Sequence, residues 1–444
     1  MKKIYFLQLI AFAMIWMMLP VNSIAQPLKV FVASDMHVMK SELIINDGPA
    51  LEQYLAGDRK LLRESEAIFD AIIDTALSIQ PDIVLFPGDL TKDGELVSHQ
   101  YIAEQCQLLE DNGIQVFVVP GNHDINNPHA FAFDGEDVIP VEGVSPEDFS
   151  TIYADFGFNE AIAHDPNSLT YIVEPVPGLQ LFAMDVCKYD DNYANNYPET
   201  GGRLKEESYN WIMQKLQEAK DADKRVLGMM HHGLVEHYVG QKTLFDEYVI
   251  DGWDTLSVNF ADAGMKAVFT GHYHSHDIVA KTSDAGNTIY DIETGSSVTW
   301  PCPFRTIDIS DNDLVSIETG LIEEINYDLG GQDFQDYAYD YISAGFPILV
   351  NFILTQQYGV PQELADQMNP AITEGFLQHY YGNEPGPSPE SQAVIEFLVN
   401  SGDPQLMLFG NLITSIFTDP LPDDWKFAFR LKDPFDNPNP MLTF

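Results

Sequence analysis

Several histidine, aspartate and asparagine residues in this sequence follow directly after short apolar runs. The run at 114–120 ends in the motif Gly121-Asn122-His123-Asp124. An asparagine amide oxygen can bind a metal ion, a histidine can transfer a proton, and an aspartate can orient that histidine. Since such triplets are often only turns, this one indicates chemistry only if other parts of the chain supply partners.

Four other apolar runs end in residues of the same kind. The motifs that follow them are Asp35-Met36-His37, Gly88-Asp89, His231-His232-Gly233 and Gly271-His272-Tyr273-His274. Residues two apart on an extended segment face the same side, so Asp35 and His37 can bind one divalent metal ion together. Six of the 12 histidines lie at these run ends, and six independent helix caps or core histidines would be an unusual coincidence.

The apolar runs alternate with stretches of helical periodicity. We expect helices at 58–79, 99–111 and 206–222, and strands at 28–33, 82–86, 114–120, 168–173, 179–185, 225–230, 267–270, 288–294 and 305–317. Strand, helix, strand, helix, strand is the order of a layered α/β domain. In such domains the loops at the carboxyl ends of the strands collect the ligands, and the motifs occupy those loops.

The five motifs together resemble those of the calcineurin-like metallophosphoesterases. All five occur in the family's order, between Leu28 and Pro303. The resemblance implies an α/β fold, namely a four-layer α/β/β/α sandwich with two metal ions between its sheets. We place this domain at residues 27–322.

The resemblance also implies a set of metal ligands. One metal ion would be held by Asp35, His37 and His274, the second by Asn122, His231 and His272, and both by Asp89 as a bridge. His232 is the alternative to His231, which we prefer because it leaves the strand first and fits the family's spacing to Gly233. Mixed nitrogen and oxygen ligands favour divalent or trivalent Fe, Mn or Zn without deciding among them.

The chemistry implied is hydrolysis of a small-molecule phosphoester by a metal-bound hydroxide. The resemblance places His123 beside the leaving group and Asp124 where it would orient that histidine. No Arg or Lys lies within the motifs, and sites for phosphomonoesters often add basic residues. A phosphodiesterase is therefore favoured, with a phosphomonoesterase or nucleotide pyrophosphatase as the alternative.

The chain is strongly acidic, with 68 acidic against 22 basic residues and a formal charge of −46. Such a surface repels phosphate backbones, so we expect no nucleic-acid partner. Lys2 and Lys3 precede the apolar segment 4–20, and Ser23-Ile24-Ala25 suits a cleavage site. This pattern predicts a signal peptide at 1–25 and a periplasmic or secreted protein without stable membrane insertion, although an uncleaved anchor is the alternative.

The character of the sequence changes after about Glu323. Helical periodicity at 334–357, 361–381, 391–399 and 405–417, with Pro and Gly between, predicts a mainly helical region at 323–444. Its aromatic residues are most simply explained by packing between helices. The more specific interpretation is that the region forms a cap over the substrate. A hypothesis from another class is a surface-binding protein built on this region. A large exposed apolar patch would favour that hypothesis, whereas helices packed onto the motif loops would belong to the enzyme.

Overall fold

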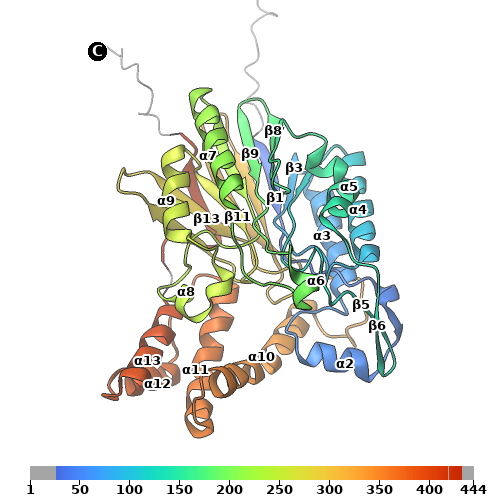
Figure 1. The fold of residues 1–444 in the computed structure, drawn as a ribbon. Coiled ribbons are helices and arrows are strands. Elements are labelled where there is room, and N and C mark those ends of the chain that lie inside the picture. The colour runs from blue at the N-terminus through green and yellow to red at the C-terminus, as the bar shows by residue number, and fades with distance from the viewer. Residues whose placement is uncertain (1–26, 419, 433–444) are drawn as a thin grey trace, which may run out of the picture.

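Two β-sheets packed face to face form the centre of the molecule (Figure 1). This computed structural model describes residues 27–418 and 420–432, so the predicted signal peptide lies outside the described residues. The first sheet contains β1 (Leu28–Val32), β3 (Ile83–Phe86), β4 (Gln115–Val118), β14 (Pro303–Ile309), β15 (Leu314–Leu321) and β16 (Lys426–Arg430). Its strand order is β16-β15-β14-β1-β3-β4, with β1, β3 and β4 parallel.

The second sheet has seven strands in the order β12-β13-β11-β10-β9-β8-β7. They are β7 (Ala163–His164), β8 (Tyr171–Val176), β9 (Leu179–Ala183), β10 (Arg225–Met229), β11 (Ala267–Thr270), β12 (Ile278–Thr282) and β13 (Thr288–Glu293). Strands β9, β10, β11 and β13 run parallel. The motif loops after β10 and β11 therefore leave this sheet at the same end, where the carboxyl ends of its parallel strands lie.

Alternating side chains explain why the sheets form layers. On β1, Val30 and Val32 enter the core between the two sheets, while Phe31 packs on the opposite face. That outer face is covered by α3 (Ser65–Ile79) and α4 (Leu96–Asp111). The outer face of the second sheet is covered by α7 (Glu206–Asp221) and α9 (Trp253–Ala263). The result is the predicted four-layer α/β/β/α sandwich.

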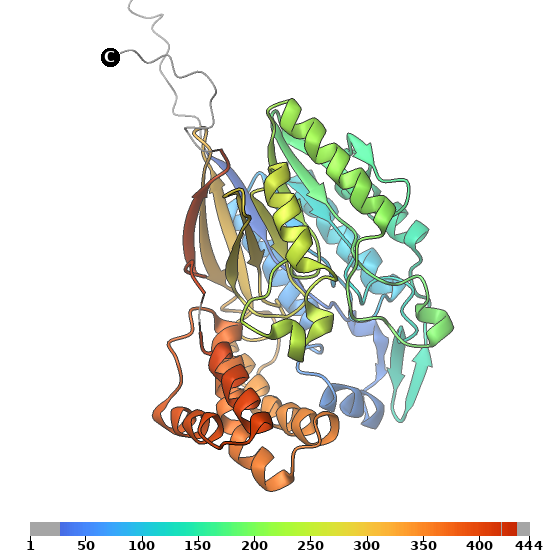
Figure 2. The same cartoon turned by 60° about the vertical axis from the view of Figure 1, so that its left-hand side comes forward.

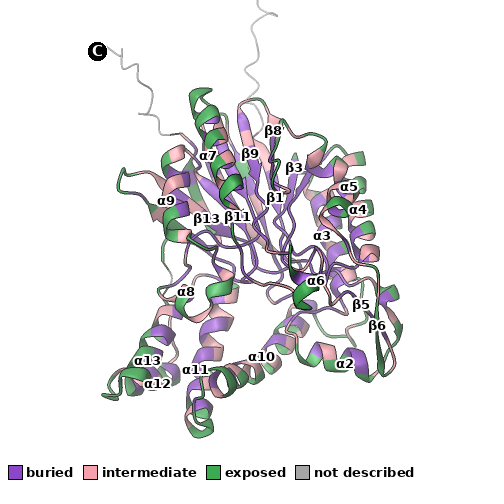
Figure 3. Cartoon of the chain, in the orientation of Figure 1, coloured by how far each residue is buried: buried purple, intermediate pink, exposed green. Residues whose placement is uncertain are grey.

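Smaller elements lie around the main strands and helices. A three-stranded sheet consists of β2 (Ile44–Asn46), β5 (Phe131–Asp134) and β6 (Asp137–Pro140). The remaining short elements are α2 (Pro49–Ala56), α5 (Pro146–Ile152), α6 (Asn192–Asn195), α8 (Gln241–Leu244), the 3-10 turns Ser41–Leu43 and Asp246–Tyr248, and the π turn Ala154–Phe158. Figure 3 shows the sheets buried and the outer helix faces exposed.

The C-terminal region places four helices beneath the loop end of the sandwich (Figure 1). They are α10 (Phe334–Phe352), which continues in the π turn Ile353–Gln357, α11 (Gln362–Tyr381), α12 (Pro389–Val399) and α13 (Pro404–Ile416). The region is not helical throughout, because β16 returns to the first sheet and pairs with β15 (Figure 2). No helix among the described residues is long and apolar enough to cross a membrane.

One helix begins later than predicted. The sequence pattern indicates a helix from Asp58, but α3 begins at Ser65. Asp58 Oδ1 instead accepts the backbone N–H groups of Arg59, at 2.6 Å, and Lys60, at 2.9 Å. The N–H of Leu61 donates to the carbonyl oxygen of Val298 at 2.8 Å. These contacts hold residues 57–64 as an ordered loop beside the motif loops.

Candidate metal centre

The five motif loops meet at one end of the sandwich. The backbone N–H of His37 donates to the carbonyl oxygen of Asp89 at 2.9 Å, which joins the loops after β1 and β3. The N–H of His123 donates to Asp89 Oδ1 at 2.9 Å, and that of His272 to Asp35 Oδ2 at 3.0 Å. The loops of both sheets are thus tied to one another through the side chains of the predicted ligands.

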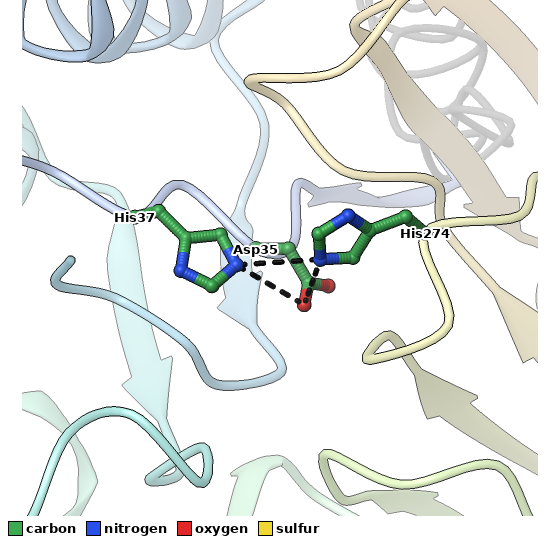
Figure 4. Close-up of side chains that lie close together, drawn as sticks. All are labelled: Asp35, His37 and His274. Atoms are coloured by element: carbon green, nitrogen blue, oxygen red, sulfur yellow. Dashed lines mark hydrogen bonds and ion pairs between the residues drawn. The ribbon is translucent and has the colours of Figure 1, made fainter. Parts of the chain in front are cut away.

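Asp35, His37 and His274 form the first cluster (Figure 4). The Nε2 atoms of the two histidines lie 3.3 Å apart, and His274 Nε2 is 3.5 Å from Asp35 Oδ1. His37 Nε2 is 4.0 Å from the same oxygen. One carboxylate oxygen and two imidazole nitrogens at these separations can converge on a single ion.

The second cluster is built around His231. Its Nε2 lies 3.0 Å from Asn122 Oδ1, 3.1 Å from His272 Nδ1 and 3.2 Å from Asp89 Oδ2. Asp89 Oδ2 is also 3.5 Å from His37 Nε2 in the first cluster. A single carboxylate oxygen therefore lies between the two clusters, where a bridging ligand has to lie.

The hydrogen bonds of the histidines fit metal binding. His231 Nδ1 donates to the carbonyl oxygen of Pro87 at 2.9 Å, and His272 Nε2 donates to that of Glu247 at 3.2 Å. The two nitrogens that face each other lie 3.1 Å apart. Although burial lowers the pKa of His231, the charge of Asp89 outweighs it and raises that pKa to about 9, so this position favours a cation, which a metal ion would supply in place of the proton. Two facing lone pairs repel unless a cation lies between them. Burial also lowers the pKa of His37 and His272 well below the usual value, which keeps both rings neutral as ligands.

The backbone at the predicted ligands is strained. Five of the seven have positive φ angles, a conformation that is rare for residues other than glycine. They are Asp35 at 52°, His37 at 40°, Asp89 at 47°, His272 at 80° and His274 at 67°. Such strain concentrates at functional sites, where the surrounding structure maintains it. The donor set, its facing lone pairs and this strain together fit two metal ions.

The motif glycines allow the loops to approach closely. A Cβ atom on Gly121 would lie 2.1 Å from Asp89 Oδ1, and one on Gly271 would lie 2.2 Å from Asp35 Oδ2. Any side chain at either position would displace a carboxylate of the centre. The glycines are therefore part of the geometry that brings the two clusters together.

His232 points away from the clusters. Its Nε2 donates to the carbonyl oxygen of Thr200 at 2.8 Å, and its ring packs 4.1 Å from that of His272. The structure thus brings His231 into the second cluster and gives His232 a supporting position behind it. His276, just beyond the last motif, is buried and contacts Thr319 Oγ1 at 2.7 Å.

His123 is held by Asp93, a residue outside the predicted set. His123 Nδ1 lies 2.9 Å from Asp93 Oδ1 and 2.7 Å from the carbonyl oxygen of Lys92. Both partners are acceptors, so Nδ1 carries a proton. Burial and the charge of Lys60 act to lower the pKa of His123, but the carboxylates of Asp89 and Asp93 outweigh them and raise it. Asp93 lies four residues after Asp89, a spacing that sequence reasoning did not use.

The predicted role of Asp124 is wrong. Its Oδ2 accepts the backbone N–H groups of Gly121 at 2.8 Å and Leu90 at 3.1 Å, while Oδ1 accepts that of Thr91 at 2.9 Å. The carboxylate thus fastens the loop after β3 to the loop after β4, and Asp93 takes the place beside the His123 ring. Burial, followed by the charge of Asp89, raises the pKa of Asp124 to about 6. A backbone-satisfying carboxylate stabilises the loops instead of orienting the histidine.

The C-terminal helices pack onto the motif loops. Tyr273, between two predicted ligands, is buried in the core of the helical region and hydrogen-bonds Tyr238 at 2.7 Å. Its ring lies 5.8 Å from that of His379 on α11. The region also exposes apolar side chains, among them Ile348, Phe352, Phe397, Leu408 and Leu421. The burial of Tyr273 in the core of the helical region is the packing expected of helices that belong to an enzyme.

The sequence model of the calcineurin-like phosphoesterases matches residues 28–276. The chain belongs to this family, whose members are metal-dependent hydrolases of phosphoesters. The match contains all five motif loops and ends at His276. It leaves the C-terminal helices outside.

The chain is also similar to individual proteins whose names describe phosphoesterases. The chain is 24% identical over 168 residues to a probable glycerophosphodiester phosphodiesterase GpdQ of Arcobacter nitrofigilis, a stretch that covers 38% of this chain and 48% of the relative. The chain thus spans about half the length of the curated relative it matches. A dimetal phosphatase from Danio rerio is similar with a TM-score of 0.46 and 13% identity, over 67% of this chain and 98% of that one. A purple acid phosphatase from yellow lupin seeds gives a TM-score of 0.42 and 13% identity, over 66% and 51%.

Proposed function

We propose that this chain is an exported binuclear metal-dependent phosphoesterase that hydrolyses phosphodiesters. The observation that carries the proposal is the position of Asp89 Oδ2, 3.5 Å from His37 Nε2 and 3.2 Å from His231 Nε2. One oxygen shared by two sets of nitrogen and oxygen donors is the arrangement that a pair of adjacent ions requires. Export rests on the sequence of residues 1–25 alone.

Each ligand set has an assigned metal ion in this proposal. Asp35, His37 and His274 would hold one, Asn122, His231 and His272 would hold the other, and Asp89 would contribute to both. When bound, two such ions would supply positive charge for the phosphoryl oxygens and would lower the pKa of a water molecule toward neutral pH. Iron, manganese and zinc all suit this donor set.

His123 supplies the proton that the leaving group needs. As water adds to phosphorus and the ester P–O bond breaks, the departing oxygen gains negative charge. The pKa of His123 is raised by Asp89 and Asp93 against the effect of burial, which favours its protonated form. Because Nδ1 is engaged by Asp93 and the Lys92 carbonyl oxygen, Nε2 is the atom that gives the proton. The alcohol leaves neutral, and His123 regains its proton from water.

A diester substrate is favoured by two observations. The curated relative is named a probable glycerophosphodiester phosphodiesterase, and the motifs themselves contain no Arg or Lys. The test is hydrolysis by the chain from Gln26 onward of bis-nitrophenyl phosphate and nitrophenyl phosphate, with added Mn²⁺ or Zn²⁺ and with chelator. Chelator-sensitive cleavage that favours the diester is expected. Absence of metal-dependent cleavage of either ester would refute the proposal.

A further inference from the structure

The loop at residues 57–64 carries a lysine to the metal centre. Lys60 Nζ lies 3.5 Å from His37 Nδ1, and the whole residue is only 8% exposed. The rings of His37 and His123 are 4.8 Å apart, and the charge of Lys60 acts on both. The lysine therefore lies beside the ring nitrogen of His37 that does not face the clusters, close enough to His123 for its charge to act on that ring as well.

The ammonium group of Lys60 has more donors than the surrounding protein accepts. Among the residues that the structure describes, Asp58 Oδ2, at 3.3 Å, is its one carboxylate partner. His37 cannot serve as an acceptor when it binds metal through Nε2, because its proton is then on Nδ1. Within residues 27–418 and 420–432, at least one N–H of Lys60 is left without an acceptor oxygen.

Lys92 differs from Lys60 in the partners of its ammonium group. It is fully buried, but its Nζ lies 2.7 Å from Asp93 Oδ2 and 2.7 Å from Glu95 Oε1. Two carboxylates neutralise that ammonium group and occupy its donors. Lys92 is thus a structural cation, whereas Lys60 keeps charge and donors available at the reaction site.

The position of Lys60 is fixed by its loop. Asp58 caps the loop's backbone through Arg59 and Lys60, and Leu61 is buried and donates to the carbonyl oxygen of Val298. On the other side, Arg59 packs against Gly345 of α10, where a Cβ atom would lie 2.7 Å from Arg59 Cδ. The lysine is therefore presented by an ordered segment clamped between the sandwich and the C-terminal helices.

We propose that Lys60 binds a phosphoryl oxygen of the substrate and lets this centre hydrolyse phosphomonoesters as well as diesters. The inference rests on the proposed phosphoesterase function. A monoester dianion carries one more negative charge than a diester and is more strongly repelled by a chain of formal charge −46. Lys60 offsets that charge where the dianion binds. The reaction converts the monoester and water to an alcohol and inorganic phosphate, with His123 protonating the departing oxygen.

The test compares two substrate classes in matched variants. Lys60→Met should lower kcat/KM for nitrophenyl phosphate by about 10- to 100-fold, the value of one charged hydrogen bond, and that for bis-nitrophenyl phosphate by less than about threefold. Lys60→Arg should retain most monoester activity. Arg63→Met is the control, because Arg63 comes from the same loop but pairs with Asp47 and Glu52. Calorimetry with inorganic phosphate should show weaker binding to Lys60→Met at equal metal content.

The outcomes separate this inference from the proposed function. Equal losses for both esters, or lost metal in Lys60→Met, would mean that the lysine supports His37 and would overturn the inference. A wild-type protein that cleaves diesters but no monoester would also overturn it and leave the phosphodiesterase standing. Failure to cleave either ester in a metal-dependent way would refute the proposed function itself. If Lys60→Met does not fold, Lys60→Gln serves as the test variant, and the same comparison of kcat/KM for the monoester and the diester decides.

Discussion

Replacing Asp93 by Asn tests how His123 is oriented. The substitution keeps the size of the side chain but removes the charge that lies 2.9 Å from His123 Nδ1. A hydrogen bond to a charged group contributes about 1.5–3 kcal/mol and one to a neutral group about 0.5–1.5 kcal/mol, so the exchange costs about 1–1.5 kcal/mol and should lower kcat by roughly 5- to 10-fold. The fold should survive, because Lys92 keeps Glu95 as a partner at 2.7 Å.

The assay that isolates this effect uses aryl diesters whose leaving groups differ in pKa. If Asp93 acts through His123, the Asp93→Asn variant should lose most rate with the poorest leaving groups and little with the best. Metal content, measured by elemental analysis, should stay at the wild-type level. Asp124→Asn is the comparison, since Asp124 binds backbone N–H groups and should change stability more than leaving-group dependence.

An opposite pattern would refute the reasoning. If Asp93→Asn had the wild-type dependence on leaving group and Asp124→Asn had an altered one, Asp124 would be the orienting carboxylate. If Asp93→Asn lost a metal ion, the carboxylate would serve the metal centre directly. Either result would contradict the contacts that join Asp93 to His123.

Three further predictions concern histidines. His231→Ala should lose one metal ion by elemental analysis, because Nε2 of His231 faces three other ligands, whereas His232→Ala should keep both; the reverse would exchange their roles. His123→Ala should keep both metal ions yet lose rate, most with poor leaving groups, and metal loss would contradict its assignment. Burial lowers the pKa of His99 to about 4, so the folded state resists its protonation. Stability is therefore lost as pH falls from about 6.5 to about 4, by roughly 3 kcal/mol, and urea denaturation of His99→Gln should show a correspondingly shallower pH dependence.

Local patterns in the sequence were sufficient for most of the sandwich. The strand after residue 28 alternates Val30 and Val32 with Phe31, and each side finds an apolar layer, so its extent was predicted within a residue. The helix at 206–221 buries Ile212 and Leu216 on one face and matches its predicted range closely. Where a segment's own periodicity decides what it buries, the sequence is enough.

Segments held by distant partners were not predictable in this way. Apolar periodicity extended the helix back to Asp58, but bonds to Val298 and Asp58 keep residues 57–64 out of it. Strand β16 forms because β15 offers it an edge, and its own sequence pattern indicated no more than membership of the mainly helical region. Lys60 belonged to the misassigned helix, so no motif indicated that its side chain reaches His37.

The motifs were informative for a different reason. Their residues are placed by the ends of parallel strands, so their order along the chain already implied that they meet. Which carboxylate orients His123 depended instead on side-chain direction within two loops. Asp124 is next to His123 in sequence but bonds backbone, and Asp93 reaches the ring from the neighbouring loop. Adjacency in sequence was a poor guide to contact there.

The C-terminal helices contact the centre by two routes, and this argues against treating them as a removable appendage. On one side α10 packs on the lysine loop, where the hydroxyl of Tyr337 donates to Glu64 Oε1 at 2.7 Å. On the other, Tyr273 lies between two predicted ligands and is buried in the helical core. Cutting the chain after residue 322 would expose Tyr273, free the loop that presents Lys60 and remove β16 from its sheet. The metal ligands would remain in the sequence, but the contacts that hold the loop of His272 and His274 and the loop of Lys60 would be gone.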